Sequence, residues 1–206
     1  VYNRVLDKDV NDRDNKGARA ALRWNASDAV EVNLAYDYYE AETNGVYGYD
    51  IAGLARPAAD SFFVSTSGDE TYSIGETSGG HLTVDWAVTD NLDFVSVTGI
   101  RNIYQKWELD FTDQPVPIFK LYTINDTDTI SQEFRLAGKT DRFDYVVGAF
   151  YFDEESYSFI GDQINLLLSP GADFADPADD VRLPLPFFRR YYDVDVKSYA
   201  AFAEIN

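Results

Sequence analysis

The acidic segment near the start of the chain is the first place where residue types and spacing suggest chemistry. In DKDVNDRDN, Asp7, Asp9 and Asn11 stand at alternate positions, as in the first half of a calcium-binding loop. However, the sixth position of such a loop is Asp12 here instead of glycine, and the twelfth is Ala18 instead of glutamate. An EF-hand is therefore excluded. A solvated acidic loop is the default interpretation, and a looser surface calcium site is the alternative.

His81 is the single histidine of the chain, and cysteine is absent. One histidine cannot complete an iron or zinc site, and no serine stands in a setting typical of a hydrolase nucleophile. We therefore expect no catalytic residue, no resident metal and no cofactor. His81 is instead predicted to share one polar strand face with a set of charged residues. The full set is Arg19, Arg23, Glu31, Asp37, His81, Asp85, Glu133 and Arg135.

Aromatic residues cluster in three loop-like segments: VYGYD at 46–50, SFF at 61–63 and LPLPFFRRYYD at 183–193. Exposed Tyr, Phe and Arg side chains are typical of surfaces that capture an aromatic or sugar-like ligand. They are equally typical of loops that pack on one another, and the sequence leaves both interpretations open. The candidates for ligand capture are Tyr47, Tyr49, Phe62, Phe63, Phe187, Phe188 and Arg189.

The composition excludes one class of partner and favours another. A formal net charge of −19 repels phosphate groups, and the 17 Lys and Arg residues are scattered, which argues against nucleic-acid binding. Cations are the favoured small partners. The longest wholly apolar run, 145–152, is too short for a membrane helix.

Three similar phrases indicate the elements that position these residues: WNASDAVEV (24–32), WAVTDNLDF (86–94) and LAGKTDRFDY (136–145). Each separates two stretches with the period-two alternation of a half-buried strand. Ser or Thr beside Asp suits a tight turn, because these short side chains hydrogen-bond to the nearby backbone. The phrases therefore predict three β-hairpins, and a seventh strand is expected from about Val194 to Asn206.

One face of each predicted strand is apolar and the other is polar or small. Before the second turn, for example, Leu82, Val84 and Trp86 alternate with His81, Thr83 and Asp85. Later in that hairpin the apolar residues change parity, with Ile103, Trp107 and Leu109 at odd positions. This change predicts a β-bulge near Val95–Ser96.

Long segments at about 43–78, 112–126 and 160–192 alternate with the short turns. Short turns at one end and long loops at the other are typical of a transmembrane barrel, with turns in the periplasm and loops outside the cell. The polar face would line the lumen. Trp24 and Trp86 would lie at the inner membrane boundary, and an outer belt is predicted from Tyr36, Tyr38, Tyr39, Tyr104, Trp107 and Tyr151.

Three segments resemble the barrel of TonB-dependent outer-membrane receptors, of the type abundant in sphingomonad-like proteobacteria. They are NLDFVSVTGIRN (91–102), ISQEFRLAGKTDRFDYVVGAFYFDEESY (130–157) and DVKSYAAFAEIN (195–206). The resemblance implies an up-and-down barrel of about 22 strands with an N-terminal plug. We therefore expect residues 1–206 to be a partial barrel of about seven antiparallel strands, without the plug and the remaining strands. The absence of Met and of a secretory segment agrees with this expectation.

The resemblance also implies a function. A receptor of this family imports a scarce nutrient, such as a ferric siderophore, across the outer membrane of a Gram-negative bacterium. Its partners are outer-membrane lipid, TonB through the plug, and the small-molecule substrate, and it is no enzyme. Two alternatives remain open at this point: a passive outer-membrane porin, and an acidic secreted β-protein that binds cations or glycans.

Overall fold

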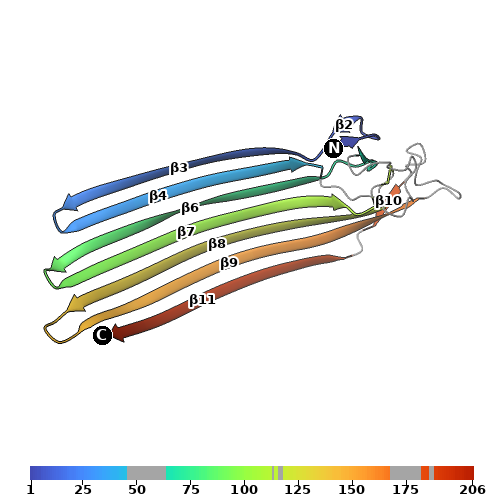
Figure 1. Ribbon diagram of the computed structural model, residues 1–206. Coiled ribbons are helices and arrows are strands. Elements are labelled where there is room, and N and C mark those ends of the chain that lie inside the picture. Colours follow the sequence, from blue (N-terminus) through green and yellow to red (C-terminus); the bar gives the residue numbers. More distant parts are fainter. Residues whose placement is uncertain (46–63, 113, 116–117, 168–181, 186–187) are drawn as a thin grey trace.

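The computed structural model describes residues 1–45, 64–112, 114–115, 118–167, 182–185 and 188–206. Its main feature is a sheet of long antiparallel strands, each hydrogen-bonded to its neighbours in chain order (Figure 1). These strands are β3 (Asp12–Ser27), β4 (Val30–Asn44), β6 (Tyr72–Thr89), β7 (Leu92–Asp110), β8 (Phe119–Lys139), β9 (Asp144–Leu167) and β11 (Arg189–Ile205). The all-β, antiparallel, up-and-down arrangement predicted from the sequence is confirmed for the described residues.

Short strands gather at the loop end of the sheet. β10 (Arg182–Leu185) pairs with the end of β9. A separate small sheet is formed by β1 (Tyr2–Asn3), β2 (Lys8–Asp9) and β5 (Val64–Ser65). Within the described residues, no helix is long and apolar enough to cross a membrane.

The three predicted hairpin turns are present, and all lie at one end of the sheet, together with the C-terminus (Figure 1). The same contact closes each turn: the hydroxyl of Ser27, Thr89 or Thr140 accepts a hydrogen bond from the backbone amide two residues later. The donor amides belong to Ala29 (3.2 Å), Asn91 (3.3 Å) and Arg142 (3.3 Å). The repeated Ser/Thr-Asp phrase is therefore explained by its local hydroxyl-to-backbone bonds, which are typical of such turns.

The strand register fixes which side chains share a face, because directly opposed residues of antiparallel strands point to the same side. We define the apolar face as the side that carries Val84, and the polar face as the side that carries Thr83. One complete row across the apolar face consists of Trp24, Val32, Val84, Ser96, Phe134, Ala149 and Ala201. The register also assigns the seventh strand, where Tyr199, Ala201, Ala203 and Ile205 lie on the apolar face.

The predicted bulge near Val95–Ser96 is wrong. The ladder of β7 with β6 is regular from Phe94 to Glu108, and its only shift lies between Ala87 and Thr89, beside the turn. The ladder of β7 with β8 has no shift. Consequently Ile103, Trp107 and Leu109 lie on the polar face, as does Tyr39 of the predicted aromatic belt.

Hydrogen bonds explain why the apolar face tolerates polar residues without a bulge. Thr98 Oγ1 donates to Gln132 Oε1 at 2.5 Å, and Gln132 Nε2 donates to Ser96 Oγ at 3.0 Å. These three side chains satisfy one another within the face, so their polar groups do not have to turn away from it. A sequence pattern that counts only apolar residues misses this compensation.

Both edges of the long sheet are open. In the described part of the chain, β3 pairs only with β4 and β11 pairs only with β9. Each edge therefore presents a row of backbone amides and carbonyls to the surroundings, which natural sheets cover or pair with another strand.

Candidate functional site

The polar face brings together all eight of the predicted polar residues. Arg19 is opposite Asp37, and Glu31 is opposite Asp85, which continues through Val95 to Arg135. The rows between them hold the other three residues: Arg23 is opposite Asn33, His81 is opposite Ala35, and Glu133 is opposite Val97. The eight predicted residues therefore share one side of one sheet. Their position in the lumen of a barrel stays a prediction.

An ion pair crosses the middle of the polar face. Arg101 of β7 reaches over β6 to Asp37 of β4, with Nη1–Oδ2 and Nη2–Oδ1 distances of 2.6 and 3.3 Å. Between them lies Gly79, where an added Cβ would clash with the carbonyl oxygen of Ile100 and would lie only 2.9 Å from Arg101 Nε and 3.0 Å from Arg101 Cζ. The missing side chain therefore provides the space in which the guanidinium lies, and the two-point contact fixes its orientation. Arg101 was not predicted from the sequence, because the pairing depends on a register across three strands.

Replacing Gly79 with alanine is expected to separate Arg101 from Asp37. The measurement is a double-mutant cycle with Arg101→Gln and Asp37→Asn, carried out once with glycine and once with alanine at position 79. We expect a measurable coupling energy with glycine and none with alanine. An undiminished coupling in the alanine background would show that Gly79 is not needed for the contact.

Other charged side chains of the polar face also pair locally. Arg23 Nη2 donates to Glu31 Oε2 at 2.5 Å, and Glu31 also accepts from Asn33 Nδ2 at 2.8 Å. Arg135 Nε lies 2.9 Å from Glu133 Oε1 on the same strand. The face therefore offers mixed charges in a fixed arrangement, which suits contact with polar or hydrated molecules.

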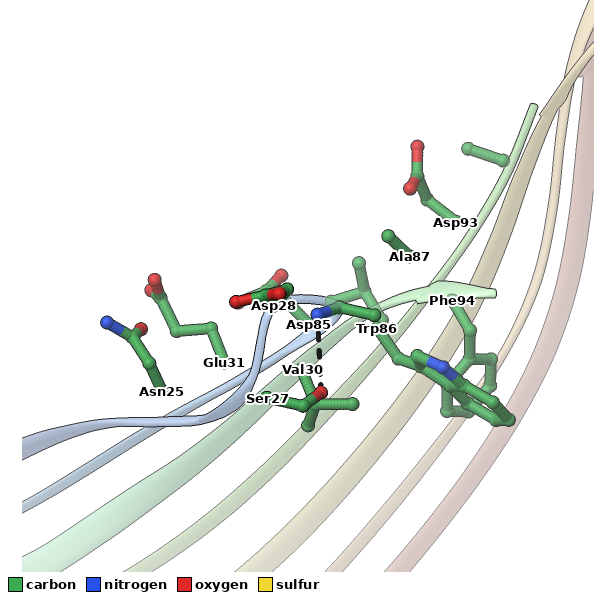
Figure 2. A pocket seen from close by; sticks show the side chains of 13 residues that line it. Asn25, Ser27, Asp28, Val30, Glu31, Asp85, Trp86, Ala87, Asp93 and Phe94 are labelled. Carbon is green, nitrogen blue, oxygen red and sulfur yellow. Dashed lines mark hydrogen bonds between the residues drawn. The ribbon is translucent and has the colours of Figure 1, made fainter. Parts of the chain in front are cut away.

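A hollow of about 720 Å³ lies at the turn end of the sheet. Figure 2 shows Asn25, Glu31 and Asp93 on one side of the ribbon there, and Trp86 and Phe94 on the other. The division between the two faces thus holds up to the turns.

The calcium candidates do not form a site in the structure. Asp7 accepts a hydrogen bond from the hydroxyl of Tyr2, and Asp9 lies in β2. Asp7 and Asn11 have φ angles of 52° and 60°, the left-handed conformation that Asp and Asn adopt in turns. Among the described residues, no group of three or more His, Cys, Asp or Glu side chains is arranged to hold a metal ion.

Five of the loop residues proposed for ligand capture lie outside the described residues: Tyr47, Tyr49, Phe62, Phe63 and Phe187. Phe188 is described, and its amide donates to Asp162 Oδ1 at 2.6 Å while its ring lies 4.9 Å from the Arg190 guanidinium carbon. Arg189 is exposed at the start of β11, opposite Gly161. The two described residues of this set are therefore neighbours at the loop end of β11, and ligand capture stays a prediction.

The loop end contains a buried polar cluster that the sequence did not reveal. Asn3 is 2% exposed, and its Oδ1 accepts the amides of Val5 and Leu6, both at 2.9 Å, while its Nδ2 donates to Ser67 O at 2.8 Å. Ser67 Oγ donates in turn to Asp110 Oδ2 at 2.7 Å. Satisfied hydrogen bonds therefore help to hold these segments together.

Lys120 extends this arrangement, because it is directly opposite Asp110 and points to the same side of the sheet. Its ammonium group contacts Asp69 at 2.8 Å and also Glu108, and all three side chains are about four-fifths buried. Burial by itself lowers the pKa of Lys120, but the hydrogen bonds to Asp69 and Glu108 outweigh it and raise that pKa above its ordinary value.

This shift predicts a pH dependence of the loop end. A lysine whose pKa is raised by folding stabilises the folded form below the ordinary pKa of 10.5, and this contribution is lost as the pH rises through the folded value. We expect the protection factors of the amides near Asp69, corrected for the intrinsic base-catalysed exchange rate, to stay constant up to about pH 10.5 and to fall above it. In Lys120→Met this loss of protection at high pH should be absent. A loss of equal size in the variant would show that other groups cause it.

Comparison with known proteins adds no identification. A scan of the chain against protein-family models found no match, and a search of curated proteins found no relative.

Proposed function

We propose that this chain is part of the transmembrane barrel of an outer-membrane receptor of the TonB-dependent type, which imports a scarce nutrient such as a ferric siderophore. The observation that carries the proposal is the apolar face, which is continuous across all seven long strands next to the turns. A water-soluble sheet would cover such a face with a second layer. In the described residues, nothing lies over it.

Exposure in the interior strands supports the lipid assignment. Leu34, Ile100 and Phe134 lie on the apolar face, away from the sheet edges, and are 48%, 51% and 46% exposed. Large apolar side chains exposed in a contiguous band are unfavourable in water and favourable in hydrocarbon. The band thus has the character of a surface made for lipid.

Aromatic residues mark both limits of the band. Trp86, next to the turns, is 46% exposed, and Tyr36, toward the loops, is 51% exposed. One row beyond Tyr36, the same face carries acidic residues, among them Asp128 and Glu155. Aromatic girdles flanking an apolar band about 25 Å tall are typical of outer-membrane barrels.

The open edges support a larger ring. An unpaired strand edge in lipid costs several kcal/mol for each unsatisfied backbone group, so spanning sheets are closed. We therefore infer that further strands pair with β3 and β11. The paired charges of the polar face would then line the lumen and contact a plug or a hydrated substrate.

Active import, as opposed to passive diffusion, rests on the resemblance of residues 91–102, 130–157 and 195–206 to TonB-dependent receptors. The first test is the intact mass of the natural polypeptide, isolated from membranes. A barrel of about 22 strands with a plug should exceed roughly 75 kDa, at about thirty residues for each strand with its loop. A mass of about 30–45 kDa would instead indicate a porin.

The second test is uptake by cells that depend on this polypeptide. We expect accumulation of radioactive iron supplied as a ferric siderophore, and loss of accumulation when the proton gradient is collapsed or TonB is deleted. Uptake that survives both treatments would indicate a porin. Recovery of the polypeptide as a water-soluble protein would contradict the membrane assignment altogether.

A further inference from the structure

A pocket of about 310 Å³ lies on the same side of the sheet as the apolar face, but nearer the loops. This volume is at the lower end of the range of small-molecule sites, roughly 300–1,000 Å³. The side chains that matter come from four neighbouring strands: Tyr72, Lys106, Glu108, Lys120, Tyr122 and Gln163. The register brings them together, since Tyr72, Glu108 and Tyr122 form one row and Lys120 is opposite Gln163.

A glycine lets two aromatic rings meet at the edge of this pocket. The row of Tyr122 continues to Gly161, where an added Cβ would lie 2.8 Å from the ring of Tyr122 and 2.9 Å from the ring of Phe159. The two rings tilt toward each other over this glycine, with centroids 5.6 Å apart. The pocket therefore has a fixed aromatic wall beside polar groups.

The two lysines of the pocket have different surroundings. Lys120 is held by the carboxylates of Asp69 and Glu108. Lys106 lies with its amine 5.1 Å from the centre of the Tyr72 ring, and within the described part of the chain it forms no ion pair. The ring face stabilises the ammonium group without neutralising it, so Lys106 retains a charge that an anion can bind.

We propose that this pocket binds a sugar ring that carries a carboxylate group. The ring would pack against Tyr72 and Tyr122, its acidic group would bind Lys106, and its hydroxyls would bind Gln163 and Glu108. Aromatic faces with a few convergent polar groups are suited to such a ligand.

The position of the pocket indicates where this sugar comes from, and this step rests on the proposed function. Lys106 is six residues beyond Ile100 of the apolar band. At about 3.3 Å for each residue and a strand tilt of about 40°, it would lie roughly 15 Å further along the membrane normal. Because Ile100 is in the row of Tyr36, at the outer limit of the apolar band, that height lies above the acyl chains, at the level of the sugars of outer-leaflet glycolipids, so we infer a glycolipid sugar as the source.

Saturation-transfer NMR on the full natural polypeptide in detergent tests the pocket. The probes are methyl β-D-glucuronide and the neutral methyl β-D-glucoside. We expect binding of the glucuronide and about tenfold weaker binding of the glucoside, as for the loss of one charge-assisted hydrogen bond. Lys106→Gln should weaken glucuronide binding to the level of the glucoside. The control is Lys16→Gln, because Lys16 also faces this side of the sheet but pairs with Glu40 at 3.5 Å outside the pocket.

Nanodiscs that contain a glucuronosyl diacylglycerol distinguish the two sources of the sugar. Saturation transfer from the protein to the lipid headgroup, seen in the wild type and lost in Lys106→Gln, would support the glycolipid as the source. Binding of the free glucuronide without transfer to the lipid would support a soluble sugar. Equal binding by the wild type and Lys106→Gln, or no binding of either probe, would overturn the pocket. A protein that inserts into membranes but binds no glucuronide would contradict the sugar-binding proposal alone. A water-soluble protein that binds the glucuronide would contradict the proposed membrane barrel alone.

Discussion

Replacing Val84 with arginine is expected to lower the free energy of unfolding of the membrane-inserted barrel by about 1–2 kcal/mol, because an arginine on the lipid side costs about 2–4 kcal/mol at the bilayer centre and less toward the boundary marked by Trp86, two residues away. Val84 lies in the row of Trp24, Val32 and Phe134, and every one of these side chains is on the apolar face. The guanidinium would have no paired charge within this row. The measurement is reversible unfolding of the full polypeptide from phospholipid vesicles in guanidinium chloride.

The neighbouring residue provides the matched control. Thr83 points to the polar face, opposite Asn33 and Val97, so Thr83→Arg should change the free energy of unfolding by less than about 1 kcal/mol. Both variants add the same side chain to the same strand, one residue apart. Equal losses at the two positions would contradict the assignment of the faces.

Replacing Lys120 with methionine is expected to destabilise the loop end of the sheet by about 2–3 kcal/mol. The substitution leaves Asp69 and Glu108 without their shared cation, although both are only about one-fifth exposed. Removal of one partner from a fully buried ion pair costs about 3–5 kcal/mol, and the residual exposure here reduces that cost. Hydrogen exchange of the amides around Asp69 and Glu108 measures the local opening free energy.

Lys8→Met is the control for this prediction. Lys8 pairs with Glu70 at 2.6 Å, but Glu70 is 70% exposed, so water can replace the lysine. We expect this variant to change local protection by less than about 1 kcal/mol. A loss in Lys8→Met as large as that in Lys120→Met would mean that burial does not set the importance of these pairs.

The sequence predicted the hairpins well because their signals are local. The Ser or Thr of each turn binds an amide two residues away, and alternation along one strand is set by the backbone alone. The polar set that includes Arg19, His81 and Arg135 was found for the same reason. Its members follow from parity within each strand, and the register then placed them on one face.

The features that the sequence did not predict depend on contacts between strands. The expected bulge at Val95–Ser96 assumed that apolar residues always share a face, whereas Gln132 satisfies Ser96 and Thr98 where they stand. The contact of Arg101 with Asp37 needs Gly79 from the strand between them. Such contacts become visible only when the register across several strands is known.

Site-directed spin labelling of the membrane-inserted polypeptide tests the central claim most directly. This chain has no cysteine, so single cysteines introduced along β6 can each carry one nitroxide label, after any cysteine elsewhere in the polypeptide is replaced. We expect labels at Leu82 and Val84 to relax with dissolved oxygen, which concentrates in lipid. Labels at His81 and Thr83 should instead relax with a water-soluble nickel complex. An alternation with period two along the strand would support a lipid-facing apolar face, and nickel accessibility at all four positions would contradict it.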